Sequence, residues 1–363
     1  MSNIKLNKLL NLVHNEKKAL KILVIRNGLI GDTVFITPVL FRLNKNLPTS
    51  IIDVLTGYKS NELLDQFPGI QNIYTLPKQF KVLEHVKFFF SLRKNNYDII
   101  LIQELNTHYT LISKITGAKI IIGYKNKLSW LIDLDIERKG HIVHAEQLLI
   151  DRIFPCPDVP TILYTTAVED NRADQILLEN NLRKGKIIVC IQVSCSEKNS
   201  VRKWQNDKLS KLCDYILERY DSQIYFSGVQ SELDEIKTVQ NGMKHSSVSL
   251  AGKTSLRELI AIIKKTTFVI GPDTGTLHIA NAVRTPVIMY MGFSDPKETG
   301  PYDDSGLSKI IKVNLDCAPC CEKNPKPLQW EYCKNHRPAK CMEMIKVDDM
   351  ISAVDSLIYK ITN

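Results

Sequence analysis

The sequence predicts an α/β protein made of two similar domains, each built around a parallel β-sheet. Three observations indicate this class. The chain has 363 residues, more than the roughly 250 that a single hydrophobic core usually supports. Short apolar runs alternate with helix-like segments, as in parallel sheets that helices cover on both faces. The alternation stops at a stretch that contains Pro155, Pro157 and Pro160 and restarts at Gly185, so we interpret this stretch as an interdomain linker.

From this division we expect an N-terminal domain over residues 1–160, a C-terminal domain over residues 161–345 and a final helix within residues 346–363. Both domains have a Rossmann-like order of elements. Two such domains joined by a linker predict parallel sheets that face a central cleft.

The composition, with 44% hydrophobic and 24% charged residues, is that of an ordinary soluble protein. No apolar run approaches the roughly 20 residues of a membrane-spanning helix. The Lys-rich start also lacks the apolar core of a secretory signal. We therefore expect a cytoplasmic protein.

The formal net charge of +9 favours an anionic partner, such as a nucleotide, a phosphorylated glycan or an acidic lipid surface. Nucleic acid is not expected, because no basic strip interleaved with aromatic residues is present. Residues 1–20 alternate apolar residues with Lys and predict a basic amphipathic helix. Such a helix could lie on the anionic inner membrane as a peripheral contact, or it could dock on its own domain.

The first domain opens on a strand that leads into a glycine-containing turn. Lys21–Arg26 has the continuous apolar character of a buried strand. The turn Asn27–Asp32 follows, and a helix is expected over Thr33–Leu47. Because Pro38 interrupts this pattern, the helix either has Thr37 as its N-cap or starts at the end of the turn and kinks. Further strands are expected at 50–55, 73–76, 97–102 and 119–123, and helices at 61–67, 82–95 and 141–154.

In either case Gly31 and Asp32 lie at the carboxyl edge of the first strand. Open parallel sheets bind their ligands along this edge. The turn matches neither the Gly-x-Gly-x-x-Gly dinucleotide fingerprint nor a Walker A loop, which would end in Gly-Lys-Ser/Thr. The local pattern therefore predicts a ligand site without naming the ligand.

The second domain repeats this order of elements. Its expected strands are 186–193, 223–227 and 248–250, and its expected helices are 207–220, 231–242 and 255–265. The most informative stretch is Gly271–Ala282, where Asp273, Thr274 and Gly275 fall between the end of a strand and the start of a helix. Unpaired N–H groups and the helix dipole make that position a site for phosphate. Asp273 could instead serve only as an N-cap.

Five of the nine cysteines lie in the last fifth of the chain, namely Cys317, Cys320, Cys321, Cys333 and Cys341. The spacing allows a four-cysteine structural zinc site made of Cys317, Cys320, Cys333 and Cys341, in which His336 could replace one ligand. The second interpretation is a set of reduced thiols packed in a long loop, because disulfides are not expected in a reducing compartment.

Five motifs in a fixed order go beyond these local patterns. They are Ile25–Asp32 with Thr37–Leu40, Arg202–Trp204, Leu250–Leu256, Gly271–Ala280, and Gly292–Pro296 with Thr299–Tyr302. In this order they resemble glycosyltransferase family 9, the ADP-heptose:lipopolysaccharide heptosyltransferases and their relatives, over nearly the whole chain from Lys21. The resemblance implies a GT-B fold, a donor nucleotide held mainly by the C-terminal domain, inversion at the anomeric carbon and no catalytic metal.

The resemblance also implies roles for individual residues. Asp32 corresponds to the general base that takes the proton of the acceptor hydroxyl. The acceptor-side loop would comprise Asn27, Gly28 and Gly31. A cation would stabilise the leaving nucleoside diphosphate. The family usually has Lys where Arg202 stands and Lys203 follows it here, so either residue could be that cation.

The expected donor-binding residues are Ser194, Glu232, Asp273, Thr274, Gly275, Thr276, Leu277 and His278. Two of them have a second interpretation. Glu232 would contact a ribose hydroxyl or would only stabilise the start of its own helix. His278 would act in the donor site or would only satisfy a backbone carbonyl.

The predicted function is transfer of heptose from ADP-heptose to a lipopolysaccharide core acceptor, either lipid A–Kdo or a heptosyl residue. A first alternative is a family member that uses another nucleotide sugar in surface-glycan synthesis. A second is a catalytically idle protein that binds glycan or nucleotide at the membrane face. The joint presence of Asp32 and the Asp273 motif favours an enzyme.

Overall fold

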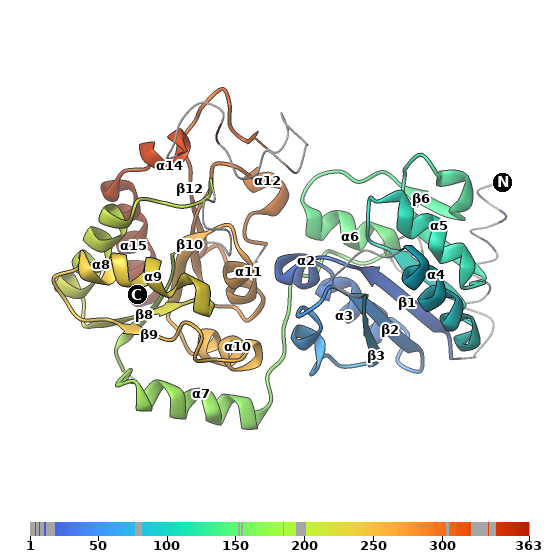
Figure 1. Ribbon diagram of the computed structural model, residues 1–363, viewed down its shortest axis with the longest axis horizontal. Helices are drawn as coiled ribbons and strands as arrows, with labels where there is room; N and C mark the ends of the chain where they lie inside the picture. Colours follow the sequence, from blue (N-terminus) through green and yellow to red (C-terminus); the bar gives the residue numbers. More distant parts are fainter. Residues whose placement is uncertain are drawn as a thin grey trace. The chain divides into compact units, whose positions relative to one another are not determined.

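The computed structural model describes residues 4, 7, 11, 19–76, 82–151, 153, 155–183, 185–193, 201–302, 305–320, 333 and 339–362. The chain divides into two compact units, Met1–Leu163 and Tyr164–Asn363. Each unit contains one six-stranded parallel sheet flanked by helices (Figure 1).

The sheet of the first unit has the strand order β3-β2-β1-β4-β5-β6. Its strands are β1 (Lys21–Arg26), β2 (Ile51–Thr56), β3 (Ile70–Thr75), β4 (Ile99–Ile102), β5 (Ile120–Tyr124) and β6 (Leu134–Ile136). Its helices are α2 (Ile30–Phe35), α3 (Thr37–Asn46), α4 (Val82–Ser91), α5 (Thr107–Ile115) and α6 (Ile142–Asp151), with 3-10 turns η1 (Asn61–Leu64), η2 (Leu92–Asn95) and η3 (Ser129–Leu131). The strand order reverses between β1 and β4, which is where open α/β sheets bind ligands.

The second unit repeats this topology with the order β12-β11-β10-β7-β8-β9. Its strands are β7 (Ile187–Gln192), β8 (Ser222–Ser227), β9 (Val248–Ser249), β10 (Phe268–Pro272), β11 (Val287–Tyr290) and β12 (Lys309–Ile311). Its helices are α7 (Ala167–Glu179), α8 (Asn206–Arg219), α9 (Leu233–Asn241) after the turn η4 (Gln230–Glu232), α10 (Leu256–Lys264), α11 (Gly275–Ala282), α12 (Pro296–Thr299), α14 (Lys340–Met344) and α15 (Val347–Thr362). The order reverses between β7 and β10.

Buried apolar strands form both cores, as continuous hydrophobic runs predict for two-sided parallel sheets. In the first unit, α4 and α5 contribute Phe89 and Ile112 to a cluster with Leu23 and Ile25 of β1. In the second unit, the final helix α15 packs on α8 and β12. The fully buried Trp204 donates its indole N–H to the carbonyl of Ile345, 3.1 Å away, and so ties the start of α15 to the same core.

The helical segment predicted over Thr33–Leu47 starts earlier than expected and is interrupted at Ile36, which is close to the alternative of a helix that starts at the end of the turn and kinks. The structure has α2 from Ile30 to Phe35 and α3 from Thr37, so Asp32 is the third residue of a helix rather than part of a turn. Pro38 occupies the first turn of α3, where its missing N–H costs nothing. Thr37 is not the N-cap of α3, because Ile36 holds that position and Thr37 is the first residue of the helix.

Other elements differ in extent or were not predicted. The expected helices 61–67 and 82–95 tighten into 3-10 turns at η1 and η2, because short helical segments and helix ends often adopt i→i+3 bonding. The elements α5, β6, α7 and β12 have no counterpart in the prediction. Among the described residues, no helix is both long enough and apolar enough to span a bilayer.

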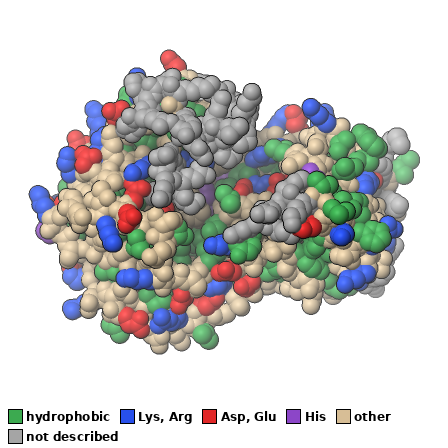
Figure 2. All heavy atoms as spheres, in the orientation of Figure 1, with side chains coloured by type: hydrophobic (Ala, Val, Ile, Leu, Met, Phe, Trp, Pro, Cys, Tyr) green, Lys and Arg blue, Asp and Glu red, His purple; other side chains and the backbone are tan. Residues whose placement is uncertain are grey.

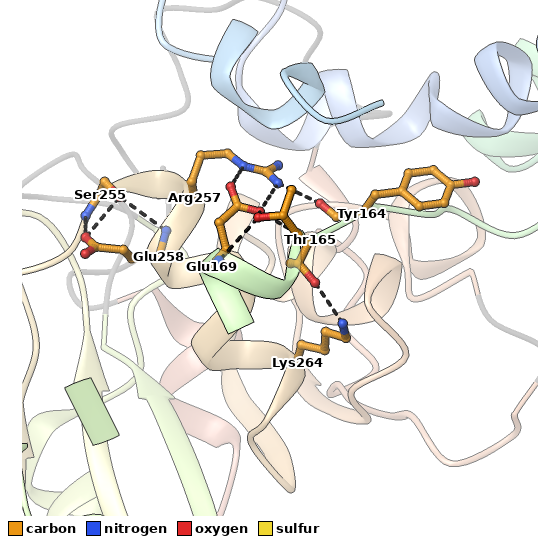
Figure 3. Close-up of polar contacts among 8 residues, drawn as sticks. Tyr164, Thr165, Glu169, Ser255, Arg257, Glu258 and Lys264 are labelled. Carbon is orange, nitrogen blue, oxygen red and sulfur yellow. Dashed lines mark hydrogen bonds and ion pairs between the residues drawn. The ribbon is translucent and has the colours of Figure 1, made fainter. Parts of the chain in front are cut away.

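Helix α7 begins at Ala167, seven residues after Pro160, and an ion-pair network holds it to α10 (Figure 3). Arg257 Nε and Nη2 lie 2.7 and 2.8 Å from the two carboxylate oxygens of Glu169, and Nη2 also donates to the carbonyl of Tyr164 at 2.7 Å. Lys264 Nζ donates to the hydroxyl of Thr165 at 2.7 Å. The hydrogen bond from Arg257 lowers the pKa of Glu169 to about 2. The start of the second unit is therefore fixed by charge-assisted contacts.

Candidate active site

In the first unit, the candidate residues gather at the carboxyl end of β1. Asp32 lies in the first turn of α2, where its Oδ2 accepts the backbone N–H of Leu29 at 2.9 Å. Its Oδ1 lies 2.7 Å from Arg26 Nη2, and the Asp32 side chain remains 35% exposed. Two donors thus orient a carboxylate that solvent or a substrate hydroxyl can still reach. That arrangement suits a general base.

The neighbouring loop residues explain how α2 approaches β1 so closely. A Cβ atom on Gly28 would lie 2.6 Å from Asp32 Cγ, so only glycine fits there. Asn27 Nδ2 donates to the hydroxyl of Tyr109 on α5 at 2.5 Å. Gly31 is the second residue of α2. The structure therefore brings Asn27, Gly28 and Asp32 to one edge of the sheet.

Arg26 links Asp32 to two further acids that sequence reasoning missed. Its Nη1 donates to the carbonyl of Gln103 at 2.6 Å and lies 3.7 Å from Glu146 Oε1 and 3.9 Å from Glu104 Oε2. Burial lowers the pKa of Arg26, but Glu146, Asp32 and Glu104 outweigh burial and raise it. Arg26 is therefore a permanent buried cation behind Asp32.

Burial has the opposite effect on the pKa of the two missed acids, Glu146 and Glu104. Burial raises the pKa of Glu146 to about 7, although Arg26 partly opposes the shift, and burial also raises the pKa of Glu104. Glu104 lies two residues beyond β4, so the rule that directs attention to strand ends could have found it. Glu146 lies in the middle of α6, and its only sequence signal is an acid among the apolar residues of that helix.

In the second unit, Asp273 follows β10 and is almost fully buried. Its Oδ1 lies 2.8 Å from His278 Nε2 on α11. Burial would raise the pKa of Asp273, but the hydrogen bond and charge of His278, with the charge of Arg202, lower it to about 2. The His278 ring thus contacts the Asp273 carboxylate.

The start of α11 has the form of an anion site. Thr274 is its N-cap residue, and Gly275, Thr276 and Leu277 form its first turn. The first N–H groups of a helix lack intrahelical partners and point toward such a site. The buried Thr274 hydroxyl oxygen also has no hydrogen-bond partner within the described part of the chain.

Gln192, at the end of β7, is a further residue that sequence reasoning missed. Its Oε1 accepts the hydroxyl of Thr276 at 3.0 Å and that of Ser227 at 2.9 Å, and its Nε2 lies 3.4 Å from Glu232 Oε1. A Cβ on Gly271 would lie 2.8 Å from Gln192 Cβ. Gln192 therefore joins the ends of β7, β8 and β10 beside α11.

The structure distinguishes the two cation candidates. Arg202 Nη1 donates to the backbone carbonyl of Asp273 at 2.7 Å, and its guanidinium lies 5.4 Å from the centre of the Phe293 ring. Lys203 instead forms an ion pair with Glu235 on α9. Arg202 is thus the cation that lies against the start of α11.

Glu232 stabilises the start of its own helical segment, as the second interpretation of this residue predicted. Its Oε2 accepts the backbone N–H of Val229 at 2.8 Å, and Glu232 is the N-cap residue of α9. Its other oxygen faces Gln192, so contact with a ribose hydroxyl stays a prediction. Ser194 lies outside the described residues.

Comparison with known proteins supplies the family. The model of glycosyltransferase family 9 (heptosyltransferase) matches residues 85–330. The chain belongs to glycosyltransferase family 9. This confirms the predicted family, and with it the prediction of a glycosyltransferase enzyme.

Relatives and solved structures agree with this assignment. The chain is 26% identical to lipopolysaccharide heptosyltransferase 3 of Escherichia coli strain K12 over 344 residues, which cover 90% of this chain and 95% of the relative. It is 25% identical to lipopolysaccharide heptosyltransferase 1 of Campylobacter coli over 311 residues, covering 81% and 89% of the two chains.

The structure of E. coli ADP-heptose lps heptosyltransferase II matches with a TM-score of 0.76 and 17% identity, covering 95% of this chain and all of that one. This match confirms the predicted GT-B class of this family 9 enzyme, with its two Rossmann-like sheets. The central cleft stays a prediction.

Four of the five late cysteines of this family 9 enzyme lie within the described residues, namely Cys317, Cys320, Cys333 and Cys341. Cys320 Sγ lies 3.2 Å from the carbonyl oxygen of Cys317. Burial, with a smaller contribution from Cys320, Cys333 and Cys317, raises the pKa of Cys341 to about 11. Across the described residues, no three His, Cys, Asp or Glu side chains gather as a metal ion would require. Cys321 and His336 lie outside the described residues, and structural zinc stays a prediction that metal analysis of the purified protein would test.

Proposed function

We propose that this enzyme transfers heptose from ADP-heptose to a lipopolysaccharide core acceptor, lipid A–Kdo or heptosyl, with inversion and without a catalytic metal. The observation that carries the proposal is the oriented, partly exposed carboxylate of Asp32 at the ligand-binding edge of the first sheet. The choice of heptose and lipopolysaccharide is supported by the names of the relatives. We place the reaction in the cytoplasm, with peripheral contact to the inner membrane.

In the proposed reaction, Asp32 accepts the proton of an acceptor hydroxyl while that oxygen attacks the anomeric carbon of the donor. The bond from the anomeric carbon to the diphosphate oxygen breaks, and ADP departs with the electron pair. Negative charge develops on the diphosphate. The N–H groups at the start of α11 and the guanidinium of Arg202 would stabilise it in place of a metal ion.

The other residues of the second unit would hold the donor. Asp273 and His278 brace the turn before α11, and Thr274 would offer its unpartnered hydroxyl. Gln192 accepts a hydrogen bond from Thr276 and donates to Glu232, and the proposed contact of Glu232 with a ribose hydroxyl would be made beside these bonds. Ser194 is retained as a donor-binding proposal from the family resemblance.

The test begins with thermal shifts for ADP, UDP, GDP, CMP and ADP-heptose, because a ligand that binds only the folded state raises its melting temperature. We expect ADP and ADP-heptose to stabilise the native protein but not Asp273→Ala. Stabilisation by a different nucleotide would mean that the donor carries that nucleotide instead of ADP. No response to any of the five would favour the idle binding protein.

The second test separates binding from catalysis. Asp32→Asn should keep the ADP-heptose thermal shift, because the donor residues lie in the other unit, and should lose transfer by roughly 10²- to 10⁴-fold. Transfer is measured as heptose incorporated into acceptor lipopolysaccharide. Wild-type activity in Asp32→Asn would refute the assignment of the base.

A further inference from the structure

One surface of the first unit combines large exposed apolar side chains with Lys and Arg. Its apolar members are Val82, Leu83 and Phe90 of α4, Leu111 of α5 and Trp130 of η3. Leu83, Phe90 and Trp130 are 64%, 60% and 75% exposed. Helix α4 packs on α5, and α5 packs on η3, so the three elements form a continuous surface that we call the α4–η3 face. Figure 2 shows hydrophobic side chains gathered on this unit, where Figure 1 places α4 and α5.

The exposed and the buried side chains of α4 lie on different sides of the helix. Leu83, Lys87 and Phe90 follow the i, i+4, i+7 spacing of one helical stripe and are all exposed. His85 and Phe89 lie on the opposite stripe and are buried. The core therefore already uses one side of α4, and the exposed apolar side chains are additional to it.

The charge of the α4–η3 face is strongly one-sided. Its exposed cations are Lys87, Arg93, Lys94, Lys114, Lys125 and Lys127. The same segments, 82–95, 107–115 and 125–131, contain a single acid, Glu84. The guanidinium of Arg93 lies 5.5 Å from the centre of the Phe90 ring, so that a cation and an aromatic side chain are presented together.

This combination of apolar and basic side chains favours a lipid surface over a protein partner. Protein–protein interfaces are depleted in Lys, whereas this face intersperses Lys with its apolar residues. Lys and Arg attract anionic headgroups, while Trp, Phe and Leu enter the boundary between headgroups and acyl chains. We propose that the α4–η3 face binds the surface of an anionic lipid bilayer.

Binding at the α4–η3 face would also position the candidate active site of the first unit. Helix α5 presents Leu111 and Lys114 on the α4–η3 face and contacts Asn27 through Tyr109. Asn27 lies in the loop that leads to Asp32. Docking would therefore hold the acceptor edge close to a lipid-linked acceptor, a consequence that rests on the proposed function. The binding itself does not depend on it.

The experiment is co-sedimentation of the full-length protein with vesicles, without donor or acceptor. Vesicles of phosphatidylcholine alone are compared with vesicles of phosphatidylcholine and phosphatidylglycerol. We expect binding only to the anionic vesicles, and at least about a ten-fold loss of affinity in L83E/F90E. K87E/K94E, which changes only exposed side chains, should show a similar loss.

Two controls test the location. V168E/L178E introduces the same charges at α7 residues of the second unit that are 78% and 72% exposed, and it should bind like the wild type. K5E/K8E changes the basic N-terminal segment and should retain most of the binding. Melting temperature and the nucleotide thermal shift verify that each variant is folded.

Three outcomes would overturn the proposal. The first is no preference of the wild type for anionic vesicles. The second is an equal loss in V168E/L178E, or a loss confined to K5E/K8E. The third is a wild-type dimer in light scattering that L83E/F90E converts to a monomer, which would assign the face to a second copy of the chain. None of these depends on whether heptose is transferred.

Discussion

Arg26 Nη2 lies 2.7 Å from Asp32 Oδ1, so the last residue of β1 is joined to the first turn of α2. Arg26 also donates to the carbonyl of Gln103 through Nη1 at 2.6 Å. One planar guanidinium therefore spans the junction of β1, β4 and α2. The orientation of Asp32 depends on a buried residue that need not contact any substrate.

The first prediction concerns Arg26→Lys. Lysine keeps the charge, but its single ammonium cannot reach Asp32 and the Gln103 carbonyl in the same geometry. If Asp32 is the base, we expect kcat of the proposed transfer to fall by about 10- to 100-fold, because the Asp32 carboxylate would be misplaced. The ADP thermal shift should be unchanged, since the proposed donor-binding residues lie in the second unit.

Arg42→Lys is the matched control. Arg42 is also buried in the first unit, and its Nη2 pairs with Asp151 Oδ1 at 2.6 Å on α6. The control should lose stability without losing kcat. Equal losses of kcat in both variants would show that Arg26 has only a structural role.

The second prediction concerns the pH dependence of stability in Glu146→Gln. Burial raises the pKa of Glu146 from 4.5 to about 7, so the folded state binds more protons than the unfolded state between these values. The free energy of unfolding of the wild type should therefore fall as pH rises through this window and level off above it. Glutamine does not titrate, and the variant should gain about 3 kcal/mol relative to wild type between pH 4.5 and 7.

Urea unfolding at several pH values checks this expectation. Glu137→Gln is the control, because Glu137 is exposed and Lys139 lowers its pKa. The pKa of Glu137 in the folded state lies below 4.5. The free energy of unfolding of Glu137→Gln, plotted against pH from 4.5 to 7, should therefore run parallel to that of the wild type. A parallel curve for Glu146→Gln as well would contradict the raised pKa.

The third prediction compares Arg202→Gln with Lys203→Gln. Arg202 contacts the backbone of Asp273, whereas Lys203 is paired with Glu235. If Arg202 stabilises the departing diphosphate, its loss should lower kcat/KM by about 10²- to 10³-fold. Lys203→Gln should change kcat/KM little. A larger effect at Lys203 would reverse the assignment of the cation.

The sequence was most informative where neighbouring residues act together. Asp273 and His278 are five residues apart, at the boundary of a strand and a helix, so one short motif contains both partners. The contacts of Arg26 with Glu146 and of Gln192 with Thr276 join residues 120 and 84 positions apart. Only the folded sheet brings such residues together, and no local pattern announces the pairing.

Missed and misplaced elements have equally specific causes. Helix α7 buries only Ala173, Ile176 and Leu177, so its apolar periodicity is weak. Its capping box, in which Thr166 and Glu169 exchange hydrogen bonds, was the signal that could have found it. Helix α5 likewise begins after Asn106, whose side chain accepts the N–H of His108 at 2.9 Å.

The last prediction tests the network in Figure 3 with Arg257→Gln. The change leaves Glu169 without its two guanidinium bonds and the carbonyl of Tyr164 without this donor. We expect the free energy of unfolding at pH 6 to fall by about 1–3 kcal/mol. Arg172→Gln is the control, because Arg172 is half-exposed and its contacts are 3.2 and 3.4 Å long; it should cost less than about 1 kcal/mol.

The cost of Arg257→Gln should also depend on pH. The pKa of Glu169 is lowered to about 2 from 4.5, so its stabilising contribution is complete above pH 4.5 and is lost as pH falls through about 2. The variant has little of this contribution to lose, so the gap between wild type and variant should narrow between pH 4.5 and 2. Urea unfolding at pH 6 and pH 3 measures the gap. An unchanged gap at pH 3 would mean that Arg257 stabilises the start of the second unit through Tyr164 and packing rather than through the charge of Glu169.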